Sequence, residues 1–338
     1  MARLHDAITD VPGILVGQAQ DETALTGCTV VLCPKGAVAG VDQRGGAPGT
    51  RETDALRPMH LVQKAHAVML AGGSAFGLDA ACGAMRWLEE RKIGFQTGTV
   101  KVPIVASAIL FDLAVGSSKV RPDAEMGYRA CVAASSDPPA EGNAGAGTGC
   151  TVGKIFGLSR AMKSGIGTAS MDCGGGILVG AIVAVNAFGD VIDPVIGAIA
   201  AGARPLGGGP LRLGGAGPFA DTLAVMRRGV GRMILRLATG GNTVIGVVAT
   251  NARLTKEGAG KVAQMAQDGL ARAIRPAHTM LDGDTLFALS TGSVRADVSL
   301  VGACAAEVTA RAIVKGALAA RAAGGLPAAH DVQQAGAR

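Results

Sequence analysis

The chain has 338 residues, 49% of them hydrophobic but only 3% aromatic, and a formal net charge of +6. One tryptophan and one tyrosine cannot readily build a stacking surface for single-stranded nucleic acid, so no nucleic-acid partner is expected. With 52 glycines, the core must consist of Ala, Val, Ile and Leu side chains and of backbones in close contact. This composition suits helices that pack on sheets.

The cysteines and histidines do not form metal-binding patterns. The seven cysteines lack a C-x-x-C pair, and an odd number without a secretion signal indicates free thiols in a reducing compartment. The five histidines show no H-x-x-x-H spacing. Residues 1–16 lack the apolar run of a signal peptide, and the apolar stretch 176–188 is too short to span a bilayer. We expect a soluble cytoplasmic protein without metal, cofactor or membrane partner.

The first half of the chain alternates strand-like and helix-like segments. Short β-branched or apolar runs bounded by turn residues predict strands at 14–16, 28–32, 37–41 and 67–70. Apolar residues at helical spacing predict a helix over 76–90. Further along, the pattern predicts an apolar segment at 102–110, a glycine-dense loop at 142–153, and a central strand or pair of strands at 176–187.

The second half begins with the best linker candidate, 202–218, which contains seven glycines and three prolines. A short helix near 222–226 and an apolar segment near 233–237 follow. The remaining pattern predicts a strand at 244–249, a helix over 255–274, a strand at 285–289, a helix over 298–322 and a disordered tail from residue 324. Strands and helices mixed in this way favour stacked layers of sheet and helix.

Two glycine-rich segments come close to known motifs but fail. The loop 145–154 lacks the first glycine of a phosphate-binding loop, and Ile155 stands where Ser or Thr would bind magnesium. The segment Gly72-Gly73-Ser74-Ala75-Phe76 resembles a nucleophile elbow, but Phe76 occupies the place of its second glycine.

Thr243 is the candidate nucleophile. It follows a Gly-Gly-Asn turn and begins a strand without charged residues. A threonine in such a place is usually only a β-branched residue in its preferred conformation. If the peptide bond after Asn242 were cut, however, Thr243 would carry a free α-amino group beside its own hydroxyl. Because an α-amino group titrates near neutral pH, one residue would then supply both nucleophile and base.

Motifs spread over nearly the whole chain resemble those of the DmpA-type aminopeptidase family, which includes β-peptidyl aminopeptidases and nylon-oligomer hydrolases. The matching blocks are residues 8–14 with 16–17, 44–52, 70–78, 102–105, 165–170, 184–187, and Asn242-Thr243 with 247–250. Together these blocks are specific to the family.

The resemblance implies an α+β fold, an αββα sandwich of the type also found in ornithine acetyltransferases. It implies one hydrolase domain, 1–338, that cuts itself between Asn242 and Thr243 into an α-chain, 1–242, and a β-chain, 243–338. Thr243 would be the nucleophile, and the family commonly forms homotetramers of such αβ units.

Asp282 and Asp284 occupy the place where nylon-oligomer hydrolases carry two aspartates. Together with Thr243, this Asp-x-Asp pair is more similar to the nylon-hydrolase branch than to the serine-type aminopeptidases. In an extended segment both carboxylates can point the same way and either hold the Thr243 amine or orient its hydroxyl. The alternative is a solvent-exposed Asp-Gly-Asp turn.

Three further residues are candidates for the site. Asn186 lies in an apolar strand, where an amide is costly unless it is hydrogen-bonded; it is either an oxyanion donor or a satisfied core residue. Lys154 matches the family's lysine, which would stabilise developing negative charge or tune the amine, although it can also be a surface lysine at a loop end. Phe111 stands where relatives commonly have Tyr, and we expect it to form an apolar wall of the substrate pocket.

These features predict an autoprocessing amide hydrolase that acts on nylon-type aminohexanoate oligomers or related short linear amides. One alternative is an aminopeptidase acting on small peptides or β-peptides. A second is an acyl transferase, in which an amine instead of water resolves the acyl-enzyme. A third, from another class, is an unprocessed binding or scaffold protein that has kept the fold.

Overall fold

The computed structural model describes residues 4–207, 213–214, 217–228, 231 and 241–336. Its main sheet has the strand order β10-β11-β14-β16-β2-β4-β7-β3, with β1 paired to β2. These strands are β1 (Leu15–Asp21), β2 (Thr26–Gln43), β3 (Thr50–Arg51), β4 (Ala65–Ala71), β7 (Val105–Ile109), β10 (Ile166–Asp172), β11 (Leu178–Asn186), β14 (Thr243–Ala252) and β16 (Thr285–Val294). The short strands β5 (Phe95–Gln96), β6 (Lys101–Val102), β8 (Thr151–Val152), β9 (Met162–Lys163), β12 (Asp190–Ile192), β13 (Ile199–Ala201) and β15 (Ile274–Arg275) form three small sheets.

The long strand β2 belongs to both halves of the main sheet. Its first part pairs with β1 and β4, whereas residues 38–43 pair with β16. The two halves of the main sheet pack face to face: one cluster of buried side chains contains residues from both halves. That cluster contains Val31, Val68 and Ala106 from one half and Ile182, Val247 and Phe287 from the other.

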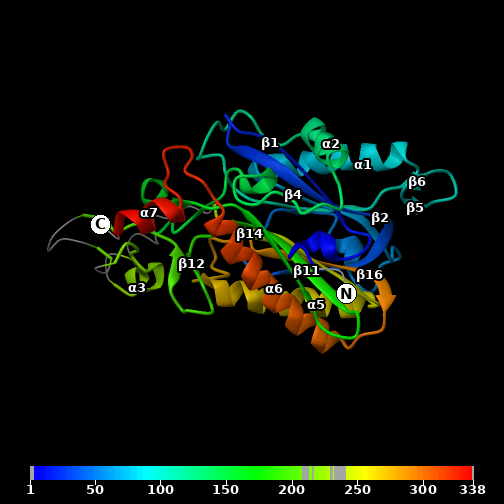
Figure 1. The fold of residues 1–338 in the computed structure, drawn as a ribbon. Coiled ribbons are helices and arrows are strands. Elements are labelled where there is room, and N and C mark those ends of the chain that lie inside the picture. The colour runs from blue at the N-terminus through cyan, green and yellow to red at the C-terminus, as the bar shows by residue number, and fades with distance from the viewer. Residues whose placement is uncertain (1–3, 208–212, 215–216, 229–230, 232–240, 337–338) are drawn as a thin grey trace.

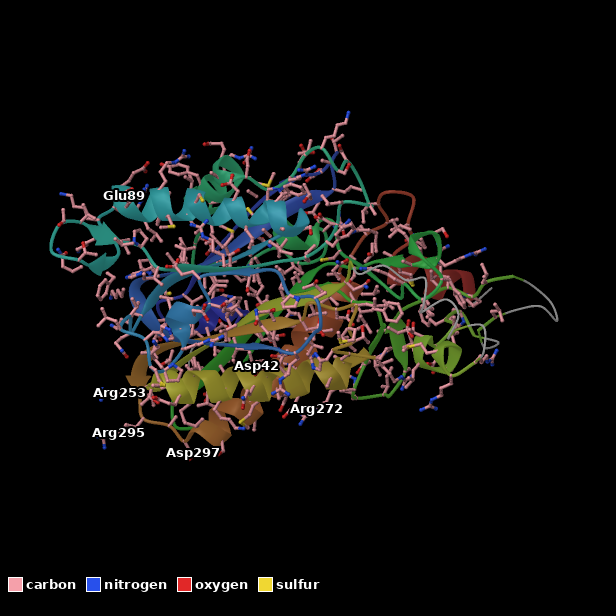
Figure 2. The ribbon with its side chains drawn as sticks, turned by 180° about the vertical axis from the view of Figure 1, so that it is seen from behind. Asp42, Glu89, Arg253, Arg272, Arg295 and Asp297 are labelled. Atoms are coloured by element: carbon pink, nitrogen blue, oxygen red, sulfur yellow. The ribbon has the colours of Figure 1, made fainter. Side chains whose placement is uncertain are left out.

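Helices cover the two outer faces of this double layer (Figure 1). On one side lie α1 (Ala80–Glu90) and α2 (Ala124–Val132), and on the other lie α5 (Lys256–Ala273) and α6 (Val298–Leu318). The shorter helices α3 (Thr222–Met226) and α7 (Ala329–Gly336) lie at one end. Figure 2 shows the exposed Glu89 of α1 and Arg272 of α5 on opposite outer layers.

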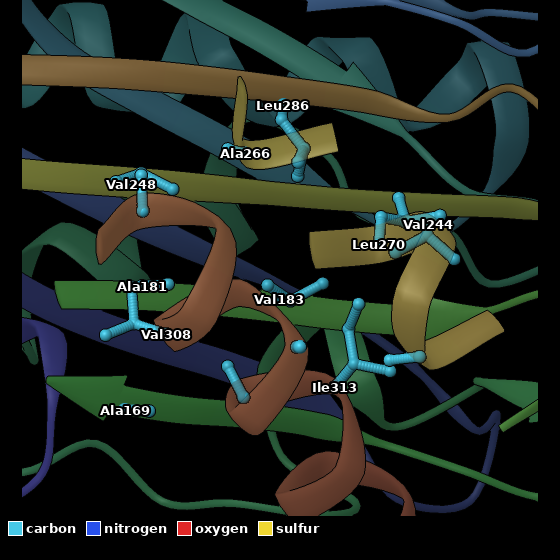
Figure 3. Close-up of a cluster of buried hydrophobic side chains, with 14 of the residues drawn as sticks. Ala169, Ala181, Val183, Val244, Val248, Ala266, Leu270, Leu286, Val308 and Ile313 are labelled. Carbon is cyan, nitrogen blue, oxygen red and sulfur yellow. The ribbon is translucent and has the colours of Figure 1, made fainter. Parts of the chain in front are cut away.

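Side chains that alternate along each strand separate the core into three layers. In β2, Cys28 and Val30 face α1 and α2, whereas Val31 faces the other half of the sheet. In the C-terminal half, Val183 of β11 and Val244 of β14 contact the layer of α5 and α6, as Figure 3 shows with Leu270 and Ile313. This four-layer arrangement confirms the predicted αββα sandwich.

The C-terminal half of the main sheet brings the candidate residues together at one end of its adjacent strands β11, β14 and β16. β14 pairs antiparallel with β11, with Thr243 opposite Asn186, and parallel with β16, with Ile245 opposite Thr285. The end of β11 and the starts of β14 and β16 therefore meet. The predicted strand–helix–strand–helix unit is confirmed as β14-α5-β16-α6.

Four structural predictions were wrong in detail. The predicted strands at 28–32 and 37–41 are one strand, because β2 passes Pro34 and Gly36 with a register shift instead of a turn. The first part of the predicted helix 76–90 is a 3-10 helix, Ser74–Asp79. The long helix predicted over 298–322 ends at Leu318. The tail predicted to be disordered contains α7, whose first residue, Ala329, is fully buried in the core.

Two predictions depend on segments outside the described residues. The apolar segment near 233–237 lies wholly outside them, and the proposed linker 202–218 lies partly outside them. Within the part of the chain that the structure describes, every helix is too short or too polar to cross a membrane.

Candidate active site

Thr243 and Asn186 form the centre of the candidate site. Thr243 is the first residue of β14 and Asn186 is the last of β11, and the two are paired across the strands. Thr243 is 3% exposed and Asn186 is fully buried. The site therefore lies at the ends of two interior strands of the sheet and is buried in the protein.

The Thr243 hydroxyl lies against the peptide bond that precedes it. Its Oγ1 donates a short hydrogen bond to the carbonyl oxygen of Asn242. The backbone N–H of Gly283 donates to the same oxygen at 2.9 Å. This carbonyl is thus polarised by a backbone donor while the neighbouring hydroxyl is held close to it.

The Asn186 side chain is fully hydrogen-bonded. Its Oδ1 accepts from the backbone N–H of Thr151 at 3.1 Å, from the Thr151 hydroxyl at 3.2 Å and from Lys154 Nζ at 2.8 Å. Its Nδ2 donates to the carbonyl oxygen of Phe111 at 2.9 Å and to that of Gly241 at 3.4 Å. The amide is thereby fixed in orientation, with its N–H₂ group shared between the carbonyl oxygens of Phe111 and Gly241.

Lys154 is directed inward and is not a surface lysine. Its Nζ also donates to the carbonyl oxygens of Asn186 at 2.9 Å and of Gly241 at 3.5 Å. Burial lowers the pKa of the Lys154 ammonium from 10.5 to about 7, and the nearby Asp282 carboxylate opposes this effect. Lys154 and Asn186 therefore converge on one carbonyl group, that of Gly241.

Asp282 and Asp284 are each 1% exposed, which rules out the solvent-exposed turn. Asp282 accepts from the backbone N–H of Phe188 at 3.1 Å and from the N–H and hydroxyl of Thr279. Asp284 accepts from the backbone N–H of Val244 at 2.9 Å. Burial and the neighbouring charge of Asp284 raise the pKa of Asp282 to about 6. The hydrogen bonds of both carboxylates thus hold the segments next to Thr243 and Asn186.

Phe111 contacts the candidate site through both its backbone carbonyl and its ring. Its carbonyl accepts from Asn186, and its half-buried ring lies beside Gly241, where a Cβ atom would be 3.1 Å from the ring. The structure thus brings all the predicted residues together around Asn242 and Thr243.

Sequence reasoning missed several groups of this site. The Gly283 N–H could not be found from the sequence, because almost every residue type has a backbone N–H. Thr151 and Thr279 bond Asn186 and Asp282, and His278 bonds Asp284. The only available signal for His278 and Thr279 was their position a few residues before the Asp-x-Asp pair.

The position of Lys154 leads to a testable pH dependence of stability. The unfolded lysine keeps its proton up to about pH 10.5, whereas the folded one loses it near pH 7, so stability rises with pH between these values. With Thr243→Ala as the common background, we expect the Lys154→Met variant to have a higher Tm than the variant that keeps Lys154, and we expect this difference to be greatest below pH 7. The difference should shrink as the pH is raised to about 9.5. A Tm difference that does not change with pH would contradict the burial of the charge.

Comparisons with known proteins agree with this fold. The model of peptidase family S58 matches residues 6–330. The chain is 44% identical over 350 residues to an uncharacterised aminopeptidase of Mycobacterium tuberculosis, covering 97% of this chain and 98% of the relative. It is 32% identical over 321 residues to a 6-aminohexanoate-oligomer endohydrolase of Kocuria sp., covering 91% and 85%.

Two solved structures share the fold. The L-aminopeptidase D-Ala-esterase/amidase of Ochrobactrum anthropi, described as a variant of the Ntn hydrolase fold, matches with a TM-score of 0.70 and 22% identity, covering 98% of this chain and 93% of that one. A β-aminopeptidase of Burkholderia sp. matches with a TM-score of 0.66 and 23% identity, covering 99% and 95%. The chain therefore belongs to peptidase family S58, and its fold is similar to that of an aminopeptidase with a variant of the Ntn hydrolase fold.

Proposed function

We propose that the protein is an amide hydrolase that cuts its own chain between Asn242 and Thr243 and then uses Thr243 as an N-terminal nucleophile. The observation that carries the proposal is the position of the Thr243 hydroxyl against the Asn242 carbonyl, whose oxygen also accepts the Gly283 N–H. The products would be an α-chain, 1–242, and a β-chain, 243–338, within one hydrolase domain.

In the first stage, Thr243 Oγ1 attacks the carbonyl carbon of Asn242. The hydroxyl proton passes to the departing nitrogen, the C–N bond breaks, and an ester joins Asn242 to the Thr243 oxygen. The Gly283 N–H stabilises the oxyanion that forms during the attack. Water then hydrolyses the ester, which releases the Asn242 carboxylate and leaves Thr243 with a free hydroxyl and a free α-amine.

In the second stage, Thr243 attacks a substrate amide. Its α-amine takes the hydroxyl proton and passes it to the leaving amine, since such an amine titrates near neutral pH. The Gly241 carbonyl, on which Lys154 and Asn186 converge, marks where a substrate oxygen would be bound once the cut end of the α-chain moves away. Water finally hydrolyses the acyl-enzyme and restores Thr243.

The two aspartates act on the geometry of this centre. Asp284 binds the N–H of Val244, directly after the nucleophile, and Asp282 binds the N–H of Phe188, two residues after Asn186. We propose that these hydrogen bonds hold the nucleophile Thr243 and the oxyanion donor Asn186 in their relative positions. In the cut enzyme, the aspartates would also stabilise the Thr243 ammonium. Phe111 supplies an apolar wall without the hydroxyl of a tyrosine.

For the substrate, we propose short linear amides of the aminohexanoate-oligomer type. The proposal is supported by Thr243 combined with the Asp-x-Asp pair and by the 32% identity to a 6-aminohexanoate-oligomer endohydrolase. The second candidate is an aminopeptidase acting on small peptides or β-peptides, which the 44% identity to an uncharacterised aminopeptidase favours.

A panel of substrates separates these activities. We expect the purified enzyme to release amines from aminohexanoate oligomers, and activity only on peptides with a free N-terminus would favour the aminopeptidase. Adding ornithine tests the acyl transferase, because an acylated ornithine product would then replace the free acid. No turnover of any amide by a fully processed protein would contradict the hydrolase proposal.

We further propose that the αβ units assemble into homotetramers. Light scattering on the processed protein tests this through its molar mass, and a mass equal to one αβ unit would contradict it.

A further inference from the structure

The ring of His278 is in direct contact with the carboxylate of Asp284. The ring Nδ1 lies 2.9 Å from Asp284 Oδ2, and the backbone N–H of His278 donates to the same oxygen at 3.0 Å. The other oxygen, Oδ1, accepts from the Val244 N–H. Asp284 thus links His278 to the residue that directly follows Thr243.

The direction of the His278–Asp284 hydrogen bond follows from the chemistry of the two groups. With Asp284 as the acceptor, which is the role of an ionised carboxylate, the proton of this hydrogen bond lies on Nδ1 of His278. Asp284 is 1% exposed, whereas the His278 side chain is 22% exposed. The imidazole therefore covers a buried carboxylate and adds a side-chain donor to the two backbone donors, the N–H groups of Val244 and His278.

The backbone at His278 determines which substitutions the site can accept. Its φ of +56° lies in the left-handed region, which disfavours most side chains. Glycine adopts this region freely, and asparagine is the side chain that tolerates it best. Asparagine also carries an N–H₂ group at the δ position, where histidine has Nδ1.

We propose that His278 is a positioning residue: its Nδ1–H fixes the rotamer of Asp284, which in turn fixes the Val244 N–H and the nucleophile Thr243. This inference rests on the function proposed above. His278 acts through Asp284 and takes no part in the bond changes at the scissile peptide. A shift of the nucleophile by about 1 Å can lower a rate about a hundredfold, which makes such a constraint effective.

The test compares His278→Gly with His278→Asn. Both variants relieve the backbone strain and keep the backbone N–H, but only asparagine keeps a δ donor. We expect glycine to slow self-cleavage and to lower kcat by a factor of about ten to a hundred, with KM within about twofold of the wild type. We expect asparagine to restore both rates to within about threefold of the wild type, with the Tm of the two variants alike.

The processing rate follows from electrophoresis of samples taken after synthesis, and kcat is measured on the processed fraction. Glycine with wild-type rates, or asparagine as slow as glycine at equal Tm, would overturn the inference while leaving the proposed function intact. A wild-type chain that stays uncut would instead overturn the proposed function, and with it the role of His278.

Discussion

Thr243→Ala is expected to remain one chain of 338 residues and to lose all hydrolysis of amides. Without the hydroxyl nothing attacks the Asn242 carbonyl, so no free α-amine forms and neither nucleophile nor base exists. The variant should still fold, because Ala also fits a buried strand position and loses only a hydroxyl bonded to the adjacent carbonyl. Denaturing electrophoresis and an assay on short amides measure the two effects.

Thr243→Ser is the matched control. Serine keeps the hydroxyl at the same position, so we expect it to be cut and to retain measurable activity. Two fragments in the alanine variant would contradict the assignment of the nucleophile. A serine variant that is folded but uncut would show that the hydroxyl alone does not account for the cleavage.

Gly283→Ala is expected to slow self-cleavage by a factor of about a hundred or more. A Cβ atom at Gly283 would lie 2.4 Å from the Ala47 carbonyl oxygen and 2.9 Å from Thr243 Oγ1. It would therefore displace both the nucleophile and the N–H that polarises the Asn242 carbonyl. The fraction of cut chain over time, measured by electrophoresis, gives the effect.

Gly260→Ala provides the control for this prediction. Gly260 lies in α5, where a Cβ atom would have open space for 4 Å around it among the described residues, and alanine favours helices. We expect this variant to be cut at the wild-type rate with unchanged or raised Tm. Equal cleavage rates for the Gly283 and Gly260 variants would exclude Gly283 from the cleavage machinery.

Much of the fold could be predicted because its signals are local. The apolar spacing of α5 and the uncharged run of β14 mark their elements to within a few residues. By contrast, Pro34 and Gly36 suggested an end to the strand that β2 passes through, since pairing with β1, β4 and β16 outweighs the local preference. The helix α7 was missed because Ala329 joins it to the core through a tertiary contact, which the local sequence pattern does not reveal.

The candidate site was predictable only in part for the same reason. Thr243, Asn186 and the aspartates could be found as residue types in matching motifs. Their hydrogen-bond partners could not, because those of Asn186 include backbone groups of Phe111 and Gly241, far away along the chain. The Gly283 N–H and the His278–Asp284 contact reach the site only once β14 and β16 lie side by side.

The most direct test of the central claim is the intact mass and N-terminal sequence of the purified wild-type protein. We predict two polypeptides, the larger ending at Asn242 and the smaller beginning at Thr243. A fully active enzyme with one uninterrupted chain, or a cut at any other bond, would contradict the account.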